Sequence, residues 1–299
     1  MIQVEQCPVC AGERLAVVFT ARDCIVTQEE FHILECDGCG LRLTSPVPHE
    51  DETDRYYESE NYTPHAASRG GNFAYRIVRR LMLVRKRNLI TTETALRCGR
   101  LLDVGCGTGE FLITMHQAGW EVDGIDASEA ARQEASRRYT VTVQSPEDWF
   151  ASGDGEYDVV TFWHALEHLP DPHHYLRRVT SSMRDDGILM IGLPNWNSLD
   201  AEYYGPEWAA YDVPRHITHF TRDAMERLLV QHGLTISSTF GLPFDAFYIS
   251  MLSEKHGHGS AMKGLWTGIK SNWAAVNDST RWSSIIYVVR KFRTSETTG

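Results

Sequence analysis

The sequence has no apolar run long enough to cross a bilayer, and its first residues form no apolar signal segment. Basic residues are also in the minority: 29 Lys and Arg stand against 40 Asp and Glu in 299 residues, a formal net charge of −11. This balance argues against a large nucleic-acid surface, because phosphate binding needs clustered cations. We expect a cytoplasmic protein without a membrane span, long enough for one α/β domain and a small extra module.

Cysteine is scarce outside one pattern. Four of the seven cysteines form two C-x-x-C pairs, Cys7 with Cys10 and Cys36 with Cys39. Two such pairs complete a tetrahedron of thiolates around Zn²⁺ and leave no open position, so the sequence predicts a structural zinc ion. Paired cysteines of this kind fit an intracellular metal site better than a secreted disulfide framework, with a redox dithiol as the alternative. Short strands expected at 15–20 and 31–35 would make this part a zinc ribbon.

A nucleotide-binding pattern is present but incomplete. From Leu101 to Leu112 an apolar strand, a glycine turn and the start of a helix follow one another, as in the first half of a βαβ unit. The dinucleotide fingerprint lacks its third glycine because Glu110 stands there, and a carboxylate disfavours a neighbouring pyrophosphate. With Asp103 before the turn, the pattern suits a ligand that has a nucleoside, a cationic end and no phosphate. Its glycines are Gly105, Gly107 and Gly109.

A second apolar run, 120–126, ends in Asp126, where a carboxylate at a strand tip binds ribose hydroxyls. With the apolar run 157–162, these motifs resemble class I S-adenosylmethionine-dependent methyltransferases in order and spacing, over roughly residues 95–240. The resemblance implies a Rossmann-like α/β fold with a mostly parallel sheet of seven strands, the others expected at 101–104, 141–143, 188–193, 235–240 and 285–289. It also implies S-adenosylmethionine as cofactor, with these candidate binding residues: Asp103, Gly105, Cys106, Gly107, Gly109, Asp126, Ala127, Glu147 and Trp163.

Three histidines are candidate general bases for an acceptor hydroxyl, since imidazole suits proton transfer at neutral pH. His168 follows the fourth strand, and His216 and His219 lie in an aromatic-rich segment after the fifth. That segment is either an acceptor pocket, with Arg215 among its polar groups, or a packed loop whose histidines satisfy backbone groups.

The run from His164 to His168 suggests a second metal site as an alternative. It is similar to the E-x-x-E-H motif of some metal-dependent O-methyltransferases, with His164 in place of the first Glu, followed by Glu167 and His168. A divalent ion there would acidify a bound hydroxyl. A plain L-E-H helix start also occurs in metal-free relatives.

The predicted organisation has three parts: a zinc ribbon at 1–44, a linker or lid with a helical segment at 45–96, and a methyltransferase domain at 97–299. The domain is expected to carry insertions at about 195–222 and 241–283. A helix is expected from residue 73 to about 96, with Ile77, Leu81, Val84 and Ile90 as its apolar stripe. The acidic, tyrosine-rich stretch at 51–62 is either a solvated linker or a lid over the substrate.

The favoured function is methyl transfer to a small molecule, most simply to a hydroxyl of a sugar or metabolite. The aromatic segment and the zinc ribbon resemble bacterial methyltransferases of sugars, polysaccharides and secondary metabolites. One alternative is an RNA methyltransferase whose ribbon grips nucleic acid, and another is a non-catalytic interaction protein. The sequence does not determine the acceptor, the methylated atom or the oligomeric state.

Overall fold

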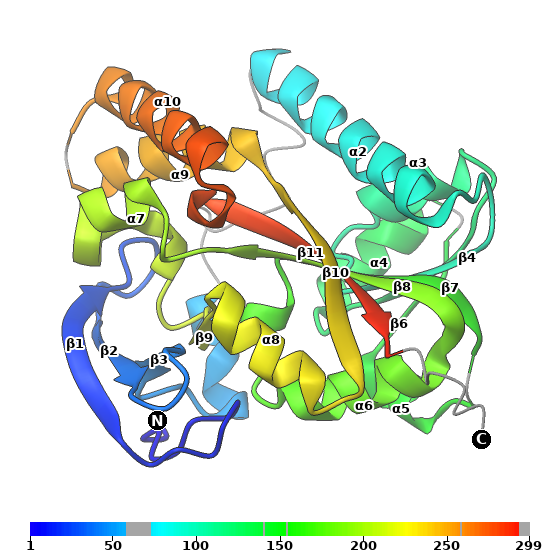
Figure 1. Ribbon diagram of the computed structural model, residues 1–299, viewed down its shortest axis with the longest axis horizontal. Helices are drawn as coiled ribbons and strands as arrows, with labels where there is room; N and C mark the ends of the chain where they lie inside the picture. The colour runs from blue at the N-terminus through cyan, green and yellow to red at the C-terminus, as the bar shows by residue number, and fades with distance from the viewer. Residues whose placement is uncertain (58–72, 140, 154, 258, 293–299) are drawn as a thin grey trace, which may run out of the picture.

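The computed structural model describes residues 1–57, 73–139, 141–153, 155–257 and 259–292. A seven-stranded sheet forms the centre of the molecule, and a second, four-stranded sheet lies at one side of it (Figure 1). No described helix is long and apolar enough to cross a membrane.

The central sheet has the order β10-β11-β8-β7-β4-β5-β6. Neighbours from β8 to β6 run parallel, and β11 is antiparallel to both β8 and β10, so the predicted mostly parallel sheet is confirmed. Strand β6 has only two residues, because the chain leaves the sheet for a helix at Pro146. The strands are β4 (Arg100–Val104), β5 (Glu121–Ile125), β6 (Val143–Gln144), β7 (Tyr157–Trp163), β8 (Met183–Pro194), β10 (Leu234–Gly241) and β11 (Ser284–Lys291).

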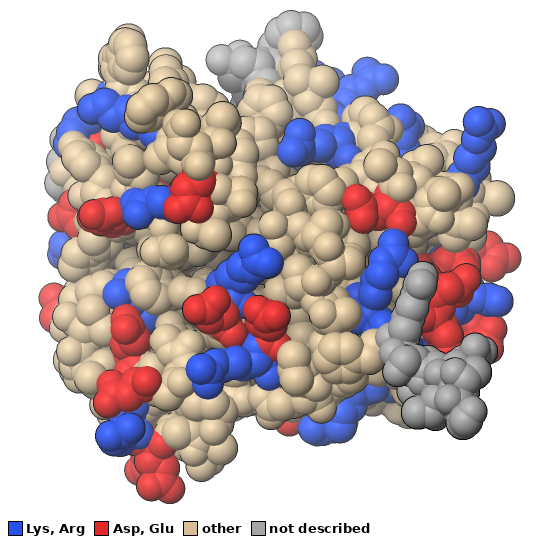
Figure 2. Space-filling view, viewed as in Figure 1, with Lys and Arg blue, Asp and Glu red and all other residues tan. Residues whose placement is uncertain are grey.

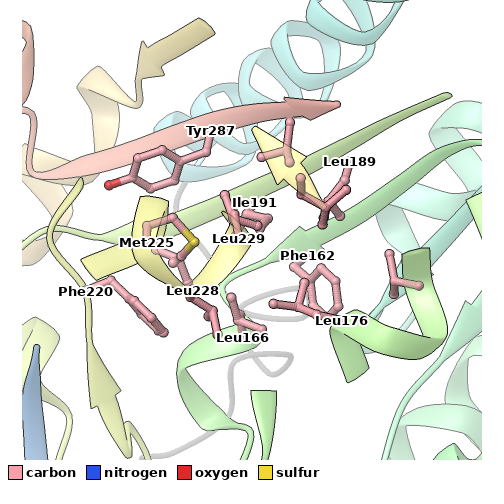
Figure 3. Close-up of a cluster of buried hydrophobic side chains, with 14 of the residues drawn as sticks. Phe162, Leu166, Leu176, Leu189, Ile191, Phe220, Met225, Leu228, Leu229 and Tyr287 are labelled. Carbon is pink, nitrogen blue, oxygen red and sulfur yellow. The ribbon is translucent and has the colours of Figure 1, made fainter. Parts of the chain in front are cut away.

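Helices cover both faces of this sheet (Figure 1). On one face, the buried side chains of the sheet pack against helices α5, α6 and α8, and Figure 3 shows Phe162 and Ile191 among Leu176, Leu228 and their neighbours. On the other face, the core includes Ile90 from α2 and apolar residues of α3. These helices are α2 (Phe73–Thr94), α3 (Glu110–His116), α4 (Glu129–Arg138), α5 (Pro146–Ala151), α6 (Pro172–Ser182) and α8 (Arg222–Val230).

The four-stranded sheet joins the N-terminal segment to the rest of the protein. Its order is β1-β2-β3-β9, all antiparallel, with β1 (Leu15–Arg22), β2 (Glu30–Cys36), β3 (Arg42–Ser45) and β9 (Thr218–His219). The first two strands confirm the expected ribbon strands. The last comes from the aromatic-rich segment, so a part of the chain about 175 residues away completes the ribbon's sheet. The cysteine pairs therefore belong to a segment whose sheet also includes a strand of the central domain.

The predicted insertion at 241–283 is helical rather than a long loop. It forms α9 (Pro243–His256) and α10 (Ala261–Asn277), which pack closely against each other as a helical hairpin (Figure 1). Small residues allow this approach: a Cβ at Gly264 would stand 2.7 Å from the Met251 Cα, and one at Gly268 would stand 2.7 Å from Phe247 Cδ1. The insertion after β8 contains α7 (Leu199–Tyr204) and short 3₁₀ turns, including 205–207 and 209–211. Further 3₁₀ turns lie at 50–56, 166–168 and 279–281.

The predicted apolar stripe of α2 is only partly correct. Ile90 is fully buried, but Ile77 and Leu81 are exposed, by 44% and 51%. The helix instead turns Met82, Leu83 and Leu89 toward the core, and its N-terminal half keeps apolar side chains at the surface. Of the acidic stretch at 51–62, residues 58–62 lie outside the described part of the chain.

Candidate functional site

The glycine turn between β4 and α3 has the conformation that the sequence predicts. Gly105, Gly107 and Gly109 all have positive φ, at 74°, 56° and 76°, a region that side chains disfavour. At Gly105 an added Cβ would also stand 2.5 Å from the Cβ of Ala165. The backbone can therefore turn tightly here and leave room for a ligand at the carboxyl end of the sheet.

Asp126 lies at the end of the neighbouring strand and is held against this turn. Gly107 N–H donates to Asp126 Oδ2 (2.7 Å), and Ser128 N–H donates to Oδ1 (2.9 Å). Ser128 also caps α4, since its hydroxyl accepts from Ala131 N–H. The carboxylate is thus fixed in place while remaining partly exposed, as a ribose ligand would require.

Asp103 is buried at the end of β4 and has a cationic neighbour that the sequence did not reveal. The Thr161 hydroxyl donates to Asp103 Oδ1 (2.6 Å), and the side chain is 2% exposed. Burial raises the pKa of Asp103 to about 7, although Thr161 and nearby Lys86 act in the opposite direction. Lys86 comes from α2 and places its ammonium 4.3 Å from the centre of the Trp163 ring. Burial lowers the pKa of Lys86 to about 8.

The remaining candidate cofactor residues surround the same sheet edge. Trp163 ends β7 and packs edge-to-face on Phe111, and its indole N–H has no hydrogen-bond partner among the described residues. Cys106 is partly buried beside β5, and burial raises the pKa of its thiol. Ala127 and Glu147 are exposed, the latter in the first turn of α5.

Glu110, which interrupts the dinucleotide fingerprint, is not an isolated charge. Its carboxylate pairs with Arg79 of α2 at 2.7 Å. The pair ties α2 to the first turn of α3, next to the glycines. The carboxylate therefore also has a structural partner, which sequence spacing alone could not indicate.

On the acceptor side, Glu167, His168 and His216 bring their polar atoms within 4.8 Å of one another. His168 Nδ1 lies 2.9 Å from the Arg215 carbonyl and His216 Nδ1 lies 2.9 Å from the Ala210 carbonyl. A carbonyl only accepts, so each Nδ1 carries the proton, and each Nε2 of a neutral ring keeps its lone pair. Both oxygens of Glu167 are buried without a hydrogen-bond partner among the described residues.

The charges around this cluster favour an ionised carboxylate and a neutral imidazole. Burial raises the pKa of Glu167, but His164, His216 and His168 outweigh it, so the net shift is downward. Burial and the neighbouring His216 lower the pKa of His168 to about 4. The Tyr57 hydroxyl lies 3.2 Å from His168 Nδ1, so one tyrosine of the acidic stretch that is either a linker or a lid contacts the cluster.

His164 is not part of this cluster, although the sequence grouped it with Glu167 and His168. Its Nε2 lies 3.2 Å from Asp245 of α9, and its Nδ1 lies 3.5 Å from Glu167 Oε1. Burial lowers the pKa of His164, but the two carboxylates outweigh it and raise it to about 9. His164 is therefore protonated at neutral pH, and the third member of the cluster is His216.

Two other residues of the aromatic-rich segment are structural. The buried guanidinium of Arg215 pairs with Asp23 (2.9 Å) and Asp212 (2.7 Å) and donates to the Tyr56 carbonyl. His219 is 5% exposed, and its Nε2 donates to Thr44 Oγ1 at 3.1 Å. These contacts match the packed-loop alternative for this part of the segment.

A small cavity adjoins the cluster. Its volume is about 10 Å³, the space of roughly one water molecule. Among its lining residues, Trp196 Nε1 and Thr218 Oγ1 are buried without partners in the described chain, as is the carboxylate of Glu167. Hydrogen-bond donors and acceptors therefore face the same small cavity, as in a site for ordered water.

The four paired cysteines also converge. Cys7 and Cys39 Sγ are 3.5 Å apart, as are Cys10 and Cys36 Sγ, and all four lie within 4.8 Å of one another. Zn–S bonds of about 2.3 Å give a tetrahedron with edges of roughly 3.8 Å, so the donor set fits Zn²⁺. A Cβ at Gly12 or at Gly38 would approach Cys10 Sγ to 3.3 Å, which explains small residues beside the cluster.

Comparison with known proteins is consistent with this geometry. Residues 73–239 match the family described as the methyltransferase domain. The chain belongs to this family. A ubiquinone biosynthesis O-methyltransferase of Thiobacillus denitrificans is 33% identical over 170 residues, which are 52% of this chain and 73% of the relative. Its namesake in Xanthomonas campestris pv. campestris is 32% identical over 140 residues, 44% of this chain, so the chain spans 59% of that relative's length.

Solved structures support the fold alone. A candidate sarcosine dimethylglycine methyltransferase from Galdieria sulphuraria superposes with a TM-score of 0.51 at 16% identity, over 70% of this chain and 86% of that one. The family match begins at Phe73, so α2 with Arg79 and Lys86 is part of the matched region.

Proposed function

We propose that the protein is an S-adenosylmethionine-dependent O-methyltransferase that acts on a hydroxyl of a small molecule. Membership of the methyltransferase family and the O-methyltransferase names of the relatives support this reaction. The glycine turn, Asp103 and Asp126 support the donor site. The observation that carries the proposal is the cluster of Glu167, His168 and His216, which brings a buried carboxylate and two imidazoles within 4.8 Å of one another.

In the donor site, each charged group matches one part of S-adenosylmethionine. We assign Asp126 to the ribose hydroxyls and Asp103 to the methionine ammonium. Lys86, beside Asp103, is suited to the methionine carboxylate. Trp163, with Lys86 over its ring, closes the apolar side of the site.

The buried oxygens of Glu167, which have no hydrogen-bond partner in the described chain, leave a place for a hydrogen-bond donor or a cation. An acceptor hydroxyl would be such a donor. S-Adenosylmethionine, when bound, supplies the electrophilic methyl group, and alignment provides much of the rate. As the hydroxyl oxygen attacks the methyl carbon, the electrons of the broken S–C bond go to sulfur and the proton goes to His168 Nε2. Glu167 stabilises the imidazolium that forms.

His168 is the favoured base among the three candidates. Its Nδ1–H is fixed by the Arg215 carbonyl, and its Nε2 is left to receive the proton. His216 is its partner in the cluster, and the two rings meet edge-to-face at 4.6 Å. His219 is the weakest candidate because its Nε2 already binds Thr44.

The same cluster favours a second mechanism, in which a divalent cation would be held by Glu167, His168 and His216. Two imidazoles and one carboxylate are a common donor set for transition metals. A metal ion, when bound, would acidify the acceptor hydroxyl, and His168 would then be a ligand rather than a base. Dialysis against a chelator separates the two: activity lost and restored by a divalent ion supports the metal, and unchanged activity supports the histidine base.

We also assign a structural zinc ion to the four cysteines, in the predicted ribbon of residues 1–44. The ribbon's edge binds the central domain through the Asp23–Arg215 pair and β9, so its role here is to support the acceptor side. An RNA methyltransferase remains the alternative, and a strongly salt-dependent shift of RNA mobility would favour it.

The experiment that tests the proposal is mass spectrometry of products from a panel of nucleotide sugars, phenols and cell-extract metabolites. His168→Gln should reduce turnover by roughly 10²–10⁴ and leave donor affinity nearly unchanged. His174→Gln is the matched control, because His174 is exposed and stacks on Phe150. Equal turnover of the two variants would remove His168 from the mechanism.

A further inference from the structure

The outer side of α10 is an apolar surface with no partner in the described chain. Six large side chains at helical spacing point outward, and Trp266, Trp273 and Val276 are exposed by 58%, 72% and 73%. The six are Met262, Leu265, Trp266, Ile269, Trp273 and Val276. Its inner side carries small residues that pack on α9, so the contact between the two helices does not use this outer surface. Exposed apolar side chains gathered along one face of a helix mark an interaction site.

The charged residues on α10 and on the N-terminal half of α2 are all basic, although Lys263 pairs with the buried Glu254 of α9 (3.2 Å) and the exposed Asp278 follows the end of α10. Helix α10 has Lys263 and Lys270 and no carboxylate between Ala261 and Asn277. Helix α2 runs along the same upper side of the molecule and has no carboxylate before Glu93 (Figure 1). Its exposed face combines Arg76 and Arg80 with the apolar Ile77 and Leu81. Figure 2 shows Lys and Arg along this upper side, over α2 and over α10.

This face contrasts with the rest of a chain whose net charge is −11. We propose that α10, with the N-terminal half of α2, binds the surface of a bilayer that contains anionic lipid. Tryptophan and long apolar side chains enter the headgroup boundary, and lysine and arginine contact lipid phosphates at its edge. The acidic remainder of the protein is repelled by such a membrane, which favours an approach by this side.

A second copy of the chain would complement this face less well. A two-fold interface places the same patch on both sides, so cations would meet cations with no carboxylate on α10 to pair them. An anionic surface satisfies both the apolar area and the uniform charge. The proposal is independent of the methyl acceptor and of any catalytic step.

The test is co-sedimentation of the full-length protein with vesicles. Neutral phosphatidylcholine vesicles are compared with vesicles containing about one third phosphatidylglycerol, at low and high salt. We expect at least tenfold stronger binding to the anionic vesicles at low salt. The Trp266→Ser/Trp273→Ser variant should lose tenfold or more of this binding, and Lys263→Glu/Lys270→Glu should weaken binding to anionic vesicles selectively.

The control is Val17→Ser/Val18→Ser, which removes exposed apolar side chains from β1 instead and should bind as the wild type does. Circular dichroism checks that all variants are folded. Wild-type protein that fails to bind anionic vesicles, or a double-tryptophan variant that binds equally well, would overturn the proposal. A dimer in sedimentation velocity that the tryptophan changes dissociate would assign the face to a second copy of the chain instead.

Discussion

A buried ion pair joins the ribbon to the central domain, and Asp23→Ala removes it. Asp23 is 0% exposed, and its oxygens accept from Arg215 and from the backbone N–H groups of Ile25, Val26 and Thr27. Burial raises the pKa of Asp23, but Arg215 and these N–H groups lower it overall, so the carboxylate is ionised at neutral pH. Truncation leaves a buried guanidinium with one carboxylate partner fewer and removes the acceptor of three backbone N–H groups and of the Thr27 hydroxyl.

Breaking a buried pair by removing one partner costs about 3–5 kcal/mol, so we expect a loss of that size in the free energy of unfolding. Urea denaturation measures it. Glu202→Ala is the control, because Glu202 pairs with Arg281 at the surface and should cost about 0–1 kcal/mol. Because the lowered pKa makes this stabilisation present above the carboxyl's unfolded pKa and lost below it, the difference between wild type and variant should shrink under acid. A cost equal to the control's would refute the role given to this pair.

Three further predictions concern the donor site and the cysteines. Asp126→Ala should weaken S-adenosylmethionine binding at least tenfold, a loss of about 1.5–3 kcal/mol in calorimetry, and unchanged affinity would mean that Asp126 does not bind the ribose. Since burial raises the pKa of Asp103 to about 7, its protonation should weaken donor binding about fivefold between pH 7 and pH 6, and Asp103→Asn should lose this dependence. Elemental analysis should find one zinc per chain, and Cys36→Ser should release it and expose residues 1–44 to protease, whereas metal-free wild-type protein would contradict the zinc site.

The central sheet could be predicted because its signals are local. Strand β4, the glycine turn and α3 follow one another within the 17 residues Arg100–His116, and the three glycines of the turn have the positive φ that glycine tolerates best. Asp126 was predictable for the same reason, since it ends the next strand. The paired cysteines were predictable because two knuckles with fixed spacing imply one tetrahedral ion.

The acceptor side could be predicted only in part because it depends on contacts between distant segments. His168 and His216 were both candidates, but their meeting with Glu167 depends on a two-residue strand, β9, that pairs with β3. Lys86 looked like one of several surface cations on a helix, and only the packing of α2 brings it to Asp103. For Arg215 the sequence left a pocket and a packed loop as alternatives, because sequence alone does not show that Asp23 faces it.

Methyl transfer to oxygen is tested most directly with S-adenosylmethionine whose methyl group is deuterated. The protein is incubated with the donor and the acceptor panel, and the labelled product is located by fragmentation and NMR. The account predicts a trideuteromethyl ether on a small molecule, formed by the wild type and by His174→Gln but strongly reduced in His168→Gln. A label found on nitrogen, carbon or RNA, or a protein that does not bind the donor, would contradict it.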